Sequence, residues 1–158
     1  MKSFLLVLLS LMAIGSFSAN AQDFSRNITE YNLTNGVGLK GYDPVSYFPE
    51  GGGKPLLGKM EYKINHLGVT YFFANVQDLE LFVGNPDKYE PTYGGYCAYA
   101  MASGSKVDIQ PALFTIHGNR LHLFVAKRAK QFFDADIAGF EINADNFWLK
   151  ISGESPRL

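Results

Sequence analysis

The stretch Tyr93-Gly94-Gly95-Tyr96-Cys97-Ala98-Tyr99-Ala100-Met101 holds the only cysteine of a 158-residue chain. Its glycine pair predicts a tight turn, because glycine adopts positive φ angles without steric cost. If the following residues form a helix, Cys97 and Met101 lie four positions apart on one face. A thiolate beside a thioether suits Cu(I). A turn leading into a buried helix, with Cys97 as a small apolar residue, explains the same stretch without a metal.

Two β-hairpins are expected around this stretch. Residues 60–64 and 69–73 are rich in aromatic and β-branched side chains, and the residues between them include Gly68. Residues 112–116 and 120–124 flank a turn that contains Gly118 in the same way. Each pair of short strands is close enough in sequence to form an antiparallel hairpin.

Helices are expected after each hairpin. Asn75 is expected to cap the N-terminus of a helix, and Gly84 fits the left-handed position at the C-terminal end of that helix. Pro86 is then expected to be the first residue of a short second helix. Residues 126–135 carry apolar side chains on one helical face. The final helix is amphipathic, since its apolar residues recur at helical spacing: Ala144, Phe147, Trp148 and Ile151.

The sequence therefore predicts one small α+β domain, in which two β-hairpins form an antiparallel sheet packed against short helices. No internal repeat and no linker are apparent. The expected boundaries are a signal peptide at residues 1–21, an extended N-terminal arm at 22–40, the domain at 41–152 and a C-terminal tail at 153–158.

The first 21 residues have the features of a secretory signal. Lys2 precedes an apolar run from Phe4 to Met12, and Ala19-Asn20-Ala21 forms a small-x-small cleavage site before Gln22. The apolar run is too short to span a bilayer as a helix. We therefore expect an exported protein, periplasmic or extracellular, with no stable membrane insertion after cleavage.

The charge balance argues against several classes of partner. The formal net charge is −1, and cleavage of the leader, which contains one lysine and no acid, makes it −2. Without a basic run there is no electrostatic case for binding nucleic acid or an anionic membrane. A single cysteine excludes an internal disulfide, although disulfides persist in the compartment expected for this chain. No protein partner can be named from the sequence.

The three histidines do not form a metal-binding or catalytic motif. His66 and His117 fall in the expected hairpin turns, where solvent exposure is the default, and His122 lies on a strand among apolar residues, which favours a hydrogen-bonded core position. None has the spacing of a zinc site. Cys97 as a nucleophile would need a histidine within hydrogen-bond reach, which sequence spacing does not reveal. The sequence therefore favours a binding protein over an enzyme.

Four short pieces, in this order, resemble the YHS domain: Asp43-Pro44-Val45, Gly68-Val69-Thr70-Tyr71-Phe72-Phe73, Leu81-Phe82 and Asn85-Pro86-Asp87-Lys88-Tyr89. The similar region covers about residues 41–90, and the chain as a whole resembles the exported stand-alone members of that family. Members attached to copper-transporting ATPases carry cysteines and have an inferred metal-binding role. In this chain the corresponding positions hold Ser46, Ala74 and Asp78.

Two functional hypotheses follow. In the first, the chain is a metal-binding module, with copper the favoured cofactor, whose ligands are Cys97, Met101, His66 and Asp43. In the second, it is a metal-free structural domain, or one that binds a small ligand or a partner through an aromatic pocket around Tyr93, Tyr96 and Tyr99.

Overall fold

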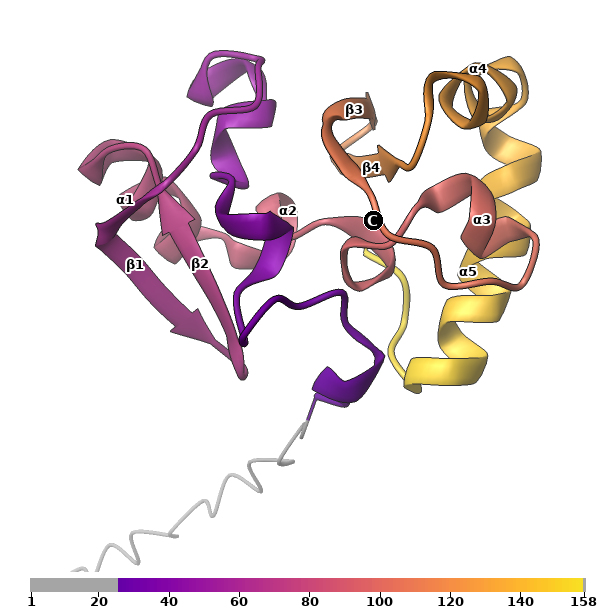
Figure 1. Ribbon diagram of the computed structural model, residues 1–158, viewed down its shortest axis with the longest axis horizontal. Helices are drawn as coiled ribbons and strands as arrows, with labels where there is room; N and C mark the ends of the chain where they lie inside the picture. The colour runs from indigo at the N-terminus through magenta and orange to yellow at the C-terminus, as the bar shows by residue number, and fades with distance from the viewer. Residues whose placement is uncertain (1–25, 158) are drawn as a thin grey trace, which may run out of the picture.

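A computed structural model describes residues 26–157. The expected signal peptide and its cleavage site lie outside these residues. The described chain is α+β, as the sequence predicts, with two antiparallel hairpins and five α-helices (Figure 1). The strands and helices are β1 (Lys59–His66), β2 (Val69–Phe73), α1 (Val76–Gly84), α2 (Pro86–Tyr89), α3 (Ala98–Ala102), β3 (Gln110–His117), β4 (Arg120–Phe124), α4 (Lys127–Ala135) and α5 (Ile137–Ser152).

Local sequence signals explain most of these elements. The side chain of Asn75 accepts a hydrogen bond from the Asp78 N–H (2.9 Å) and so caps α1, and Pro86 is the first residue of α2. Gly84 is the last residue of α1 and is not left-handed, so its expected role at the helix end is wrong. None of the helices within residues 26–157 is long and apolar enough to cross a bilayer.

Each hairpin is followed by helices, and the two hairpin-and-helix segments have the same order of elements and the same strand pairing. Each hairpin forms its own two-stranded sheet. Lys59 pairs with Phe73 and Gln110 pairs with Phe124, 51 positions later, and in both hairpins the same register shift follows this first pair. The expectation that the chain has no internal repeat is therefore wrong.

The loop before each hairpin is repeated as well. Gly38–Gly41 and Thr92–Gly95 each contain three consecutive residues with positive φ: 53°, 54° and 83° in the first, 55°, 59° and 87° in the second. Two residues beyond each loop, the backbone N–H of Asp43 donates to Leu56 O (2.9 Å) and that of Cys97 donates to Val107 O (3.0 Å). Asp43 and Cys97 thus hold equivalent positions. We call residues 37–90 the first repeat and residues 91–152 the second repeat.

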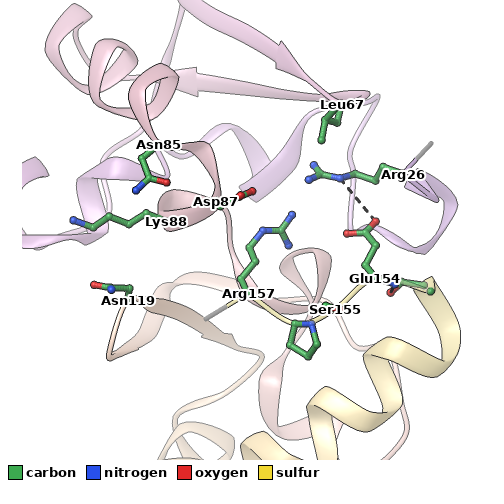
Figure 2. Close-up of a pocket in the computed structure, with 12 residues that line it drawn as sticks. Arg26, Leu67, Asn85, Asp87, Lys88, Asn119, Glu154, Ser155 and Arg157 are labelled. Atoms are coloured by element: carbon green, nitrogen blue, oxygen red, sulfur yellow. Dashed lines mark hydrogen bonds and ion pairs between the residues drawn. The ribbon is translucent and has the colours of Figure 1, made fainter. Parts of the chain in front are cut away.

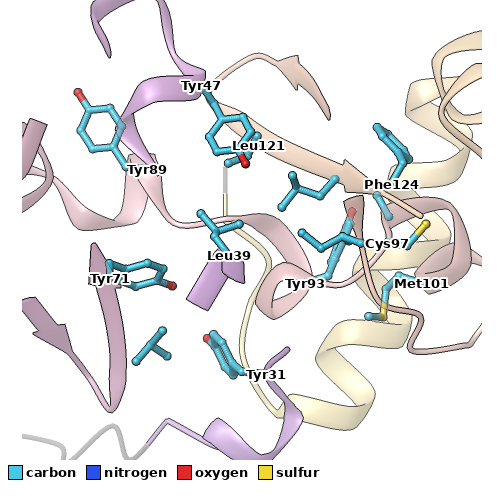
Figure 3. Packing of buried hydrophobic residues seen from close by; sticks show 14 of the residues in the cluster. Tyr31, Leu39, Tyr47, Tyr71, Tyr89, Tyr93, Cys97, Met101, Leu121 and Phe124 are labelled. Carbon is cyan, nitrogen blue, oxygen red and sulfur yellow. The ribbon is translucent and has the colours of Figure 1, made fainter. Parts of the chain in front are cut away.

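The repeats form two lobes that share one hydrophobic core (Figures 1 and 3). Residues 26–40, expected as an extended arm, are folded onto this core as short 3₁₀ turns. Tyr31 packs edge-on against Trp148 of α5, with ring centroids 5.4 Å apart. Gly94 lies under the same indole, since a Cβ atom at that position would sit 2.8 Å from Trp148 Cη2. The N-terminal arm, the Thr92–Gly95 loop and α5 therefore meet at one point.

Candidate binding site between the repeats

Cys97 and Met101 share one helical turn, as the sequence predicts. The Met101 N–H donates to Cys97 O (2.9 Å), at the start of α3. Both side chains are fully buried, and Figure 3 shows them among the apolar residues of the core. Within residues 26–157, the one group of three His, Cys, Asp or Glu side chains close enough to share a metal ion contains His66 but neither Cys97 nor Asp43. The structure does not bring the four expected ligands together.

Asp43 is a buried acceptor for backbone N–H groups. Its carboxylate accepts hydrogen bonds from Val45 (2.8 Å), Ser46 (3.3 Å) and Ala74 (2.8 Å). Burial raises the pKa of Asp43, the hydrogen bond from the Ala74 N–H lowers it, and a hydrogen bond with the Asp78 carboxyl raises it, which together bring it to about 7. Ser46, Ala74 and Asp78, which the sequence resemblance aligns with cysteines of YHS domains, therefore surround a carboxyl group in this chain.

The three tyrosines of the expected aromatic pocket have separate neighbours. Tyr93 is buried and donates its hydroxyl to Asp145 Oδ1 (2.8 Å). Tyr99 stacks on Phe132, with ring centroids 5.7 Å apart, and Tyr96 is half-buried elsewhere on the loop. These side chains contribute to the packing of the second repeat, and none of the three lines the cavity described below.

His122 is a hydrogen-bonded core histidine, as expected. Its Nδ1 lies 3.0 Å from Thr92 Oγ1 and its Nε2 lies 2.7 Å from Glu141 Oε1. Burial lowers the pKa of His122 in spite of this carboxylate. Burial alone would raise the pKa of Glu141, but hydrogen bonds with His122 and His117, together with the charge of Arg120, lower it to about 2. Glu141 is therefore ionised at neutral pH.

Glu90 occupies the position in the first repeat that Glu141 occupies in the second, and it is almost completely buried. Arg26 donates to both of its oxygens (2.6 and 2.8 Å), Arg157 donates to Oε2 (2.5 Å) and the Tyr71 hydroxyl donates to Oε1 (2.9 Å). Burial would raise the pKa of Glu90, but Arg157 and Arg26 hold it below its usual value. The two arginines come from opposite ends of the described chain, so this carboxylate ties both ends to the junction of the repeats.

His66 and Asp87 lie beside Glu90. His66 Nε2 is 4.0 Å from Glu90 Oε2, and one ligand atom of each of the three residues lies within 4.8 Å of the other two. His66 Nε2 is buried and has no hydrogen-bond partner among residues 26–157. The ring of His66 packs edge-on against Phe82, with centroids 5.8 Å apart. Contrary to expectation, His66 belongs to the end of β1 and is only partly exposed.

A cavity of about 830 Å³ opens next to this group, between the two repeats (Figure 2). Its wall includes Asp87 of α2, Asn119 from the turn of the second hairpin, and the segment after α5 that carries Glu154 and Arg157. Arg157 Nε and Glu154 Oε1 are buried and have no hydrogen-bond partner in the described part of the chain. Glu154 Oε1 also lies 3.8 Å from Arg26 Nε, an ion pair that Figure 2 marks with a dashed line. Charged groups of both signs therefore line this cleft.

Sequence reasoning found His66 at this site but missed Arg26, Glu90 and Arg157. These residues are far apart along the chain, and each is of a type that usually lies on the surface. Comparisons of the chain with protein-family models, with curated proteins and with solved structures find no match.

Proposed function

We propose that this chain is an exported, non-enzymatic binding protein of YHS type, and that the cleft between its repeats holds a small polar molecule with an anionic group. The observation that carries the proposal is the cavity of about 830 Å³, which falls within the range of about 300–1,000 Å³ typical of ligand sites. Cavities between two structural units are common binding sites. Export and the YHS resemblance come from the sequence.

The chemistry of the cleft wall suggests the class of ligand. Arg157 lines the cavity and is paired with Glu90 through Nη2, but its Nε–H has no partner among residues 26–157, which favours a carboxylate or another oxyanion. Asp87 and Glu154 offer acceptor oxygens, which favour an ammonium or hydroxyl group on the same molecule. Asn85 and Asn119 can both donate and accept. A free amino acid or a small hydroxy acid carries this combination of groups.

Calorimetry and thermal melting with a panel of the twenty free amino acids, lactate, malate and citrate test the proposal. At a hundredfold excess over its dissociation constant, a ligand specific for the folded state stabilises it by about 2.7 kcal/mol. Asn119→Trp, which fills the cavity from the hairpin turn, should abolish the shift. Asn143→Trp is the matched control, because Asn143 is exposed on α5 and does not line the cavity. If no compound stabilises the wild type more than Asn119→Trp, the cleft does not bind this class.

Copper(I) binding at Cys97 and Met101 is our second candidate. The observation in its favour is that the two residues occupy one turn. Since both are fully buried, binding would require the start of α3 to open. In anaerobic melts, Cu(I) should stabilise the wild type and have no effect on Cys97→Ser. An equal effect on the two proteins, or none on either, would rule this site out.

A further inference from the structure

We propose that His66, Asp87 and Glu90 form a binding site for a divalent transition metal on the wall of the cleft, and that Arg157 competes with the metal for Glu90. This site is separate from the positions of the family cysteines, which surround Asp43. It does not depend on the small organic ligand proposed above, because binding of the metal can be measured with the metal alone.

The ligand set is one imidazole nitrogen and two carboxylate oxygens. Such a set suits Zn²⁺, Mn²⁺ or Fe²⁺ better than Cu(I), which prefers sulfur ligands. Zn²⁺ binds these atoms at about 2.0–2.2 Å, which places two tetrahedral ligand atoms about 3.4 Å apart. The three ligand atoms lie within 4.8 Å of one another, and His66 Nε2 is 4.0 Å from Glu90 Oε2. Metal binding therefore requires the exposed Asp87 side chain to rotate and His66 to move slightly closer to Glu90.

Two further features point to a ligand at this place. His66 Nε2 is buried without a hydrogen-bond partner among residues 26–157, which costs free energy unless a ligand satisfies it. The edge-on contact with Phe82 holds the imidazole in a fixed orientation, as a preformed ligand requires. Of the three ligands Asp87 also lines the cavity, so the proposed site adjoins the cleft on the Asp87 side.

Arg157 occupies the oxygen that the metal needs. The guanidinium of Arg26 bridges both oxygens of Glu90, and the Tyr71 hydroxyl takes a further position on Oε1. Arg157 donates to Oε2, which is the oxygen closest to His66. Release of Arg157 would free one acceptor position on Oε2 for the metal, while Arg26 keeps its hydrogen bond to that oxygen, and would remove one of the two positive charges beside it. The residue thus acts as an internal cation that a divalent ion can displace.

The second repeat provides a comparison within the same molecule. His117 and Glu141 are the counterparts of His66 and Glu90, 51 positions later, and they approach to 3.2 Å. The counterpart of Asp87 is Ala138, which has no ligand atom. The second repeat therefore has two of the three ligands, and His117→Asn is a matched control for His66→Asn.

The test is calorimetric titration of ZnCl₂ into metal-free protein. We expect one zinc ion per chain and at least a tenfold loss of affinity in both His66→Asn and Asp87→Asn. His117→Asn should bind as the wild type does, and Arg157→Gln should bind about tenfold more tightly. Glu90 is left unchanged, because its removal would leave two arginines without their partner.

The ¹⁵N spectrum of the histidine rings provides a second test, in the wild type, which does not require any variant to fold. Zinc should shift the ring signals of His66 and leave those of His117 in place. If neither the wild type nor Arg157→Gln binds zinc, the site does not exist. If zinc binding survives His66→Asn, or if the signals of His66 do not move, the metal binds elsewhere as an adventitious ion and the proposal is wrong.

Discussion

At the scale of single residues, Asp43 links the stability of the molecule to pH. Burial and the neighbouring Asp78 raise its pKa from 3.8 to about 7, so the folded state holds this proton more tightly than the unfolded chain does. The resulting stabilisation is complete below pH about 4 and is lost as the pH rises through about 7. This dependence has the opposite sign to that of Glu90 and Glu141, whose lowered pKa values stabilise the fold above pH about 4.5.

We therefore predict that the free energy of unfolding of the wild type, relative to Asp43→Asn, falls by about 2–4 kcal/mol between pH 4 and pH 7. Urea denaturation at several pH values measures it. The difference between the two proteins is needed because His122, whose pKa is lowered, contributes an opposite slope near pH 6. Glu61→Gln, at an exposed position on β1, is the control and should run parallel to the wild type. A constant difference between wild type and Asp43→Asn would mean that folding does not raise the pKa of Asp43.

Gly94 gives a second prediction at this scale. Its φ is +59°, and a Cβ atom would meet Trp148 at 2.8 Å. Gly104 has φ +77°, but its nearest contact would be 3.9 Å away. Both alanine variants should lose about 1–2 kcal/mol from the left-handed backbone, and Gly94→Ala should lose at least about 1–3 kcal/mol more from the overpacked core. Chemical denaturation measures both, and equal losses would show that the indole moves aside freely.

At the scale of the elements, α5 closes the core through Trp148. The indole is fully buried and touches Tyr31 of the N-terminal arm. We expect Trp148→Ala to cost about 3–5 kcal/mol, whereas Leu149→Ala, at an exposed position on the same helix, should cost less than about 1 kcal/mol. Thermal melts of the two variants decide it. A loss under about 1 kcal/mol for Trp148→Ala would mean that α5 is peripheral.

The elements themselves were largely predictable because their signals are local. The glycine-containing turns, the Asn75 cap and Pro86 each act within a few residues, and the structure has hairpins and helices where they indicate them. The candidate site was not predictable in the same way. Glu90 meets Arg26 and Arg157 across 64 and 67 positions, and no local pattern encodes such a contact.

At the scale of the whole molecule, the two repeats share a core but little sequence. When the two hairpin-and-helix segments are compared, identical buried residues stand at two equivalent positions: Phe73 corresponds to Phe124, and Phe82 corresponds to Phe133. A fold tolerates most apolar exchanges of similar volume, so equivalent backbones need not show a repeat in sequence. The backbone angles and strand register reveal it, because they depend on geometry and not on residue identity.

The shared core predicts that both repeats unfold together. Phe82 belongs to the first repeat, and Trp148, the only tryptophan, belongs to the second. Phe82→Ala should cost about 3–5 kcal/mol and should lower the unfolding midpoint reported by Trp148 fluorescence as much as the midpoint reported by far-ultraviolet circular dichroism. The counterpart variant Phe133→Ala is the control for a change within the second repeat. Separate midpoints for the two probes after Phe82→Ala would show that the repeats unfold independently.

The clamp on Glu90 has one more consequence, for the topology of the chain. Arg26 and Arg157 bind the same carboxylate, so the two ends of the described chain lie within a few residues' reach of each other. A short linker could join them, and the chain could then be opened at the exposed Gly52-Gly53 turn of the first repeat. Such a circular permutant would keep the core and the cleft, while the two arginines would become neighbours along the backbone instead of opposite ends of it.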